Sequence, residues 1–132
     1  MEIAHARLTS ASPCRALDAA AVVTKATLCA AEQLGLSNLE LGAVLGISEA
    51  SVSRLKARSR TITVKAKEGE LALMLIRVFR SLDPLVGRSE AKRLAWMESY
   101  NKALQGIPNQ LIRKVDGLAR TLVYLEGMRI AR

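Results

Sequence analysis

A chain of 132 residues has room for one compact domain, or for two small helical halves that share a core, and this length excludes a second large domain. Half of the residues are apolar but only 3% are aromatic, and alanine and leucine are abundant while β-branched residues are few, which favours helices over sheet. The 20 basic and 12 acidic residues give a net charge of +8, which points to a polyanionic partner, an acidic protein or an anionic membrane surface.

The first element expected along the chain is a long helix. Residues 1–11 show little periodic pattern. After them Ser12 suits an N-cap, Pro13 suits the first helical position and Gly35 suits a stop. These signals predict a helix over residues 13–34.

The stretch NLELGAVLGISEASVSRLKARSR, residues 38–60, has the spacing of two short helices joined by a tight turn. Ser37 or Asn38 is expected to cap a helix over 38–45, which Gly46 ends. Ser48 is expected to cap a second helix that runs to about residue 58. Five apolar residues around Gly46 are spaced for a shared core: Leu41, Leu45, Ile47, Val52 and Leu55. Gly42 is small at the point where the two helices approach each other most closely. This is the helix-turn-helix pattern.

The second helix of this pair is followed by a block of positive charge. Residues 51–67 carry six basic side chains and no acidic one, whereas residues 1–50 carry three basic and five acidic ones. In helix-turn-helix proteins the second helix lies in the major groove. Arg54 is expected to bind a guanine and Ala50 a thymine methyl, while serines and other basic residues hold phosphates. The candidate DNA-binding residues are Ser48, Glu49, Ala50, Ser51, Ser53, Arg54, Lys56, Arg58 and Arg60. A helical hairpin with a solvated basic face would explain the spacing but not its coincidence with the charge block.

After an extended linker over 59–67, the segment EGELALMLIRVFRSLDPLVG is apolar on most of its circumference and ends at Pro84 and Gly87. Such a helix is buried in a core or against another subunit. One small hairpin reads few base pairs, so we expect a homodimer. Arg77 and Arg80 are expected to snorkel or to pair with glutamates. The residues assigned to the dimer interface are Leu71, Leu75, Val78 and Phe79.

Further helices are expected over 89–103, 108–114 and 117–129. The predicted fold is therefore all-α. It consists of a DNA-binding half over 1–67, which includes the first helix and the linker, and a second helical half over 68–132.

Several kinds of function are not expected from this sequence. His5 and the isolated Cys14 and Cys29 cannot assemble a catalytic or metal site, so we expect neither an enzyme nor a cofactor, and we expect both cysteines to be reduced and buried. Trp96 and Tyr100 are expected in the core rather than in a ligand site. The longest purely apolar run is LALMLI, and no signal-peptide pattern is visible, which predicts a cytosolic protein.

The segment from EGELALMLIRVF to LVYLEGMR resembles the C-terminal toxin-binding domain of antitoxins of the Xre, MbcA and ParS type. The resemblance lies in an apolar helix, a helix with Trp96 and Asn101 followed by ALQGIP, and Gly117 at the last helix. With the helix-turn-helix it covers residues 35–132. The chain departs from the family in QGIP, where a second glycine is more common, and in Met97, where leucine is common.

This resemblance implies a bifunctional antitoxin that forms dimers or larger complexes. The N-terminal half would repress its own operon, and the C-terminal half would inhibit a RES-domain toxin that consumes NAD. The end of the chain, EGMRIAR, would enter the NAD pocket of the toxin. The alternative is that Arg129 and Arg132 are solvated residues at a helix end, where they interact favourably with the helix dipole. The implied toxin-binding residues are Trp96, Tyr100, Asn101, Arg129 and Arg132.

The residues alone leave two other functions open. One is a free-standing dimeric helix-turn-helix repressor without a toxin partner. The other is a protein-binding adaptor whose basic block meets an acidic partner.

Overall fold

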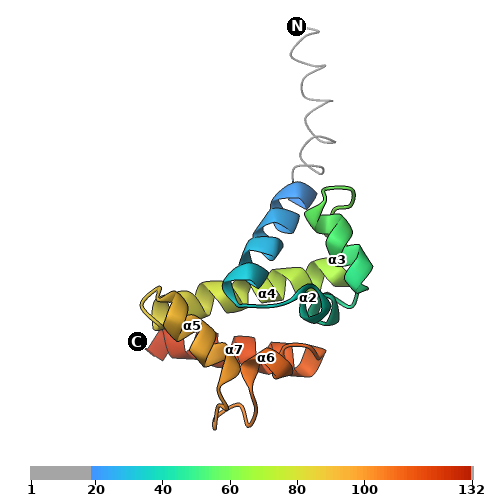
Figure 1. Cartoon of the computed structure of the whole chain (residues 1–132). Coiled ribbons are helices and arrows are strands. Elements are labelled where there is room, and N and C mark those ends of the chain that lie inside the picture. Colours follow the sequence, from blue (N-terminus) through green and yellow to red (C-terminus); the bar gives the residue numbers. More distant parts are fainter. Residues whose placement is uncertain (1–18, 132) are drawn as a thin grey trace, which may run out of the picture.

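The computed structural model describes residues 19–131, and all regular elements in this part of the chain are helices (Figure 1). The first occupies residues 19–33. The others are α2 (Asn38–Leu45), α3 (Glu49–Lys56), α4 (Lys67–Leu85), α5 (Glu90–Glu98), α6 (Pro108–Leu111) and α7 (Val115–Ala131). The predicted all-α class is confirmed. Predicted features that lie outside the described residues involve His5, Ser12, Pro13, Cys14 and Arg132.

The first helix turns one side to the core and the other to solvent. Thr27 and Ala30 are buried, whereas Cys29 between them is exposed and carries a free thiol. The prediction that Cys29 is buried is therefore wrong. Successive residues of a helix point about 100° apart, so a residue between two core positions can still face water.

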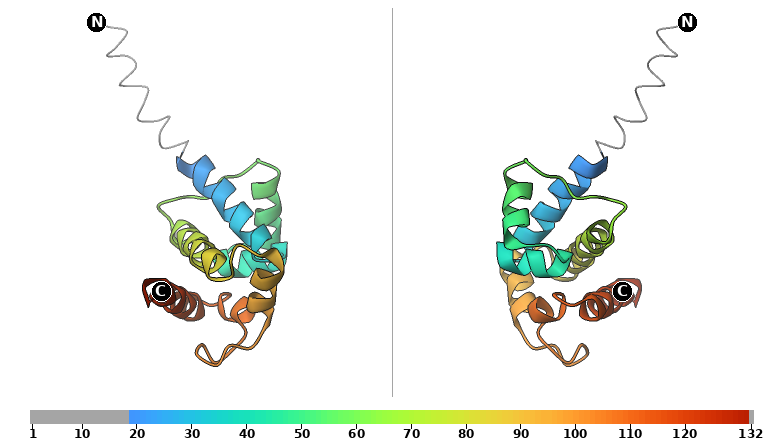
Figure 2. Two further views of the ribbon diagram at one scale, coloured as in Figure 1. Left: turned by 90° about the vertical axis from the view of Figure 1, so that its left-hand side faces the viewer. Right: turned by 90° about the vertical axis from the view of Figure 1, so that its right-hand side faces the viewer.

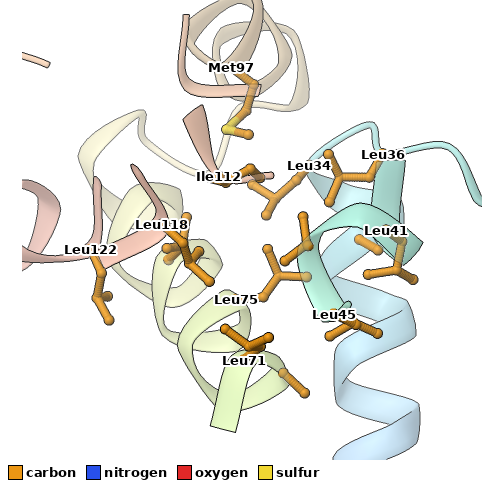
Figure 3. Close-up of a cluster of buried hydrophobic side chains, with 14 of the residues drawn as sticks. Leu34, Leu36, Leu41, Leu45, Leu71, Leu75, Met97, Ile112, Leu118 and Leu122 are labelled. Atoms are coloured by element: carbon orange, nitrogen blue, oxygen red, sulfur yellow. The ribbon is translucent and has the colours of Figure 1, made fainter. Parts of the chain in front are cut away.

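Helix α4 buries its apolar side against neighbouring helices of the same chain, while Arg77 and Arg80 remain exposed. It packs against both α2 and α7, and Figure 3 shows Leu71 and Leu75 among leucines of these two helices. Leu75 and Val78 are fully buried and Leu71 is 5% exposed. The assignment of these three side chains to a dimer interface is thereby corrected, because they form the core of a single chain. Within the described residues, no helix is long and apolar enough to cross a membrane.

Helices α4 and α7 lie side by side and run in the same direction (Figure 1). The Arg77 guanidinium donates two hydrogen bonds to Glu126, of 3.0 Å and 2.7 Å, which confirms that Arg77 pairs with a glutamate. One turn further along both helices, Arg129 donates to the Ser81 hydroxyl at 3.4 Å. The order of these two contacts agrees with the parallel arrangement of α4 and α7.

The helix predicted over 89–103 is shorter in the structure, because α5 ends at Glu98. Asn101 accepts a hydrogen bond from the Leu104 N–H through its side chain and exchanges backbone hydrogen bonds with Gly106. Asparagine side chains that bond to nearby backbone compete with helix in this way. Residues 99–107 therefore form a short hairpin, called here the 99–107 hairpin.

A buried arginine joins the first helix to α4 and α5. Arg93 is only 4% exposed, and its guanidinium donates to the backbone and side-chain oxygens of Gln33 and, at 2.8 Å, to Asp83. It also lies 5.7 Å from the centre of the Phe79 ring. Phe79, assigned from the sequence to a dimer interface, is half-buried and packs against the core instead.

We expect Arg93→Ala to lower the free energy of unfolding by about 3 kcal/mol, because it leaves Asp83 and the Gln33 carbonyl without their buried partner. Chemical denaturation followed by circular dichroism measures the change. Arg80→Ala is the matched control, since Arg80 is exposed on α4, and it should stay within about 0.5 kcal/mol of the unmodified chain. Equal losses in the two variants would contradict the role given to Arg93.

Candidate DNA-binding interface

Helices α2 and α3 cross through a tight turn that only small residues permit. Gly46 ends α2 with a left-handed φ of 73°, the conformation that favours glycine. At Gly42 a side chain would bring its Cβ within 2.7 Å of the Ile47 carbonyl oxygen, so the helices could not approach as they do. The apolar positions predicted for the shared core are confirmed as buried, with Ile47 half-buried: Leu41, Leu45, Val52 and Leu55.

Both helices of the motif begin with a serine cap, as predicted. The Ser37 hydroxyl accepts from the Glu40 N–H at 3.1 Å, and Glu40 accepts from the Ser37 N–H at 2.8 Å, which completes a capping box. The Ser48 hydroxyl accepts from the Ser51 N–H at 3.0 Å. Helix α3 ends two residues earlier than predicted, and Arg58 beyond it has a left-handed φ of 63° that a helix cannot continue through.

The outward side of α3 presents hydroxyl and basic groups to solvent. Ser48, Glu49, Ala50, Ser53 and Arg54 are exposed, and Ser51 is half-exposed. Arg54 donates to the Ser51 hydroxyl at 3.0 Å, which draws the guanidinium toward the N-terminal end of the helix. That is the end which enters the major groove in helix-turn-helix proteins.

The basic residues after α3 fall into two groups. Lys56 and Arg58 are exposed, as a phosphate contact requires. Arg60 instead forms a two-pronged ion pair with Glu68 at 2.8 Å and 3.2 Å, where the two side chains are 27% and 12% exposed. This ion pair holds the loop that follows α3, and phosphate binding by Arg60 stays a prediction.

The loop from α3 to α4, predicted as an extended linker, lacks regular structure but is tightly held. Ile62 is fully buried, and its N–H donates to the Thr24 hydroxyl at 2.9 Å. Glu68 accepts from the Thr63 N–H at 2.7 Å as well as from Arg60. Burial alone would raise the pKa of Glu68, but these hydrogen bonds and the charge of Arg60 outweigh it and hold the pKa below 4.5.

The residues implied in toxin binding lie in two places. Trp96 is half-buried on α5, while Tyr100 and Asn101 belong to the 99–107 hairpin; Tyr100 is 65% exposed, so its expected place in the core is wrong. Arg129 is exposed on the last turns of α7. The helix continues to Ala131, so the segment after residue 127 is helical.

A polar network that sequence reasoning did not find joins α2 to the C-terminal half. Arg113, just after α6, donates to Glu40 at 2.6 Å and to the Asn109 side chain at 2.7 Å. Asn109 is 2% exposed and donates to Glu98 at 2.8 Å. Glu40 and Arg113 are 73 residues apart, and the periodic patterns of a sequence do not reveal contacts between such distant residues.

Residues 15–77 match the family model of the antitoxin Xre-like helix-turn-helix domain. The match spans the first helix, α2, α3, the loop and half of α4, and it stops before α5. A comparison of the chain with curated proteins gives no match. The predicted Xre-like helix-turn-helix is therefore confirmed, and it supports a DNA-binding antitoxin.

We expect Arg54→Ala to cost about 1 to 3 kcal/mol of specific DNA affinity and to relax discrimination at one base position. Lys56→Ala should weaken binding to all sequences alike and reduce its salt dependence. Competition binding with operator variants separates the two effects. If both variants lose affinity equally for every sequence, Arg54 does not read a base.

We expect Glu68→Gln to lower the free energy of unfolding by about 1 to 3 kcal/mol at neutral pH, because it removes a charged hydrogen-bond acceptor. The folded-state pKa of Glu68 lies below the ordinary value of 4.5, so its contribution is present above pH 4.5 and lost as the pH falls through the folded-state pKa. Denaturation at several pH values should therefore show the variant and the unmodified chain converging in acid. Glu70→Gln is the control, because the Glu70 side chain is 69% exposed, and it should change the free energy of unfolding little at any pH. If the difference in free energy between Glu68→Gln and the unmodified chain stays constant as the pH falls, the expectation is contradicted.

Proposed function

We propose that the chain is the antitoxin of a type II toxin–antitoxin system, which binds its own operator DNA as a repressor and neutralises a toxin. The observation that carries this proposal is the match of residues 15–77 to the antitoxin Xre-like helix-turn-helix domain. The exposed basic and hydroxyl groups of α3 supply the chemistry that this function requires.

In the proposed repressor, two copies of the chain bind two half-sites about one helical turn apart, since one short recognition helix reads too few base pairs. Because the predicted interface residues of α4 are buried in one chain, the second copy needs another surface. Candidates are the exposed apolar side chains of α4 and α7 that precede residue 128, namely Leu73, which is 43% exposed, and Val123, which is 70% exposed. Apolar side chains grouped on a surface favour a protein partner.

The proposed toxin is a RES-domain protein that consumes NAD. The resemblance of residues 68–132 to the toxin-binding domain of Xre, MbcA and ParS antitoxins supports this choice. In the proposed complex, the turn of α7 that carries Arg129 enters the NAD pocket together with Arg132. A guanidinium suits this position, because a pocket for the cationic nicotinamide ring can carry an acidic group.

Two experiments separate this proposal from its alternatives. Binding to duplex DNA that weakens as salt rises is expected for the antitoxin and for a free-standing repressor, but not for an adaptor that binds only protein. Co-purification with the product of the adjacent gene is expected for the antitoxin alone. A chain that binds operator DNA but captures no such partner would be the free-standing repressor.

Removal of residues 128–132 tests the inhibitory role of the chain end. When the shortened chain is co-expressed with the adjacent-gene toxin, we expect cellular NAD to fall as it does with toxin alone, while DNA binding and complex formation persist. Lys114→Ala is the control, since Lys114 is an exposed basic residue just before α7 and lies away from the end of that helix, and it should protect NAD like the full chain. Full protection by the shortened chain would place inhibition on another surface.

A further inference from the structure

The 99–107 hairpin projects from the helical body at the end farther from α3 (Figures 1 and 2). Asn101 donates its N–H to the Gly106 carbonyl at 2.8 Å, and Gly106 returns a hydrogen bond at 3.3 Å. Inside this closed ring the Asn101 side chain accepts from the Leu104 N–H at 3.0 Å. The hairpin thus has its own hydrogen-bonded framework.

The hairpin is also fastened to the helices behind it. Leu104 is only 3% exposed, and its carbonyl accepts a hydrogen bond from Arg120 of α7 at 3.4 Å. The Leu111 side chain packs directly against Gly106, because a Cβ added to this glycine would lie 2.9 Å from a methyl group of Leu111. Gln105 adopts a left-handed φ of 57°, which persists only where the surroundings impose it. A partner would therefore meet a shape that is already formed, and binding would carry little cost of ordering.

The exposed groups of the hairpin are aromatic and cationic. The Tyr100 ring is 65% exposed, and Lys102, Ala103 and Gln105 are exposed beside it. Residues 99–107 contain no acidic residue. A large exposed aromatic ring and a lysine on a rigid projection suit a hollow, acidic protein surface, because tyrosine is enriched among the residues that dominate binding and opposite charges steer association.

We infer that the 99–107 hairpin is a docking element that inserts into an acidic cleft of the toxin, with Tyr100 as its anchor and Lys102 as its electrostatic guide. This inference rests on the proposed function and assigns a contact separate from the end of α7. Since α3 and the hairpin lie toward opposite ends of the molecule (Figure 1), the chain can hold the toxin and DNA together.

The test is calorimetric titration of the purified full chain with the adjacent-gene toxin. Tyr100→Ala should raise the dissociation constant about 30-fold, as loss of an interface anchor does. Lys102→Glu should raise it about 10-fold at low salt and less at high salt, because screening weakens the charge effect. Operator affinity, measured in parallel, should stay unchanged in both variants.

Three controls make the result specific. Tyr100→Phe keeps the ring and should bind within about 3-fold of the unmodified chain. Lys92→Glu makes the same charge change at an exposed residue near the start of α5, and its affinity for the toxin should fall less than that of Lys102→Glu. Circular dichroism and thermal melting verify that each variant is folded.

The outcomes separate the failure of the inference from that of the proposed function. If the unmodified chain binds the toxin, and the Tyr100→Ala and Lys102→Glu variants bind it with the same affinity, the hairpin is not a docking element. If the unmodified chain does not bind the toxin at all, the proposed function fails and the inference fails with it. If a hairpin variant is unfolded, Gln105→Lys and Gln105→Glu replace it, and equal toxin affinities for these two opposite charges would overturn the inference.

Discussion

The structure depends on the burial of α4 between two groups of helices. Its leucines contact α2 on the DNA-binding side and α7 on the other, so a single apolar core serves both halves. Each fully buried leucine contributes about 2 to 5 kcal/mol relative to alanine. The boundary predicted between residues 67 and 68 falls at the first residue of this shared helix. The two halves predicted from the sequence therefore share one core.

The parts of the fold that depend on local chemistry could be predicted from the sequence. Helix α2 has the predicted bounds, because Ser37 caps its start and Gly46 ends it in a left-handed conformation. Tertiary contacts determine the parts that were missed. The many apolar residues of α4 predicted that this helix is buried, but they did not reveal what covers it. We predicted that a second subunit covers Leu75, whereas Leu75 is buried within the single chain. The early end of α5 depends on Asn101, whose side chain bonds within the hairpin instead of extending a helix.

The same distinction holds for the candidate sites. On α3 the outward residues follow from the helical period once the turn at Gly46 is placed, so their exposure was predictable. The ion pair of Arg60 could not be predicted from the sequence, because its partner Glu68 belongs to the next helix. The burial of Arg93 could not be predicted from the sequence, because arginine in an amphipathic helix is usually exposed. Only the fold brings Gln33 and Asp83 next to its guanidinium.

The network of Glu40, Arg113, Asn109 and Glu98 ties the cap of α2 to the C-terminal half of the chain. Glu40 caps the first helix of the DNA-binding motif, while Glu98 is the last residue of α5, next to the 99–107 hairpin. The hydrogen bonds run without a break from the Glu40 carboxylate through Arg113 and Asn109 to Glu98. Because Asn109 is buried, loss of either neighbour would leave one of its polar groups without a partner. The attachment of α2 to the C-terminal half is therefore a property of the whole series of side chains and not of one ion pair.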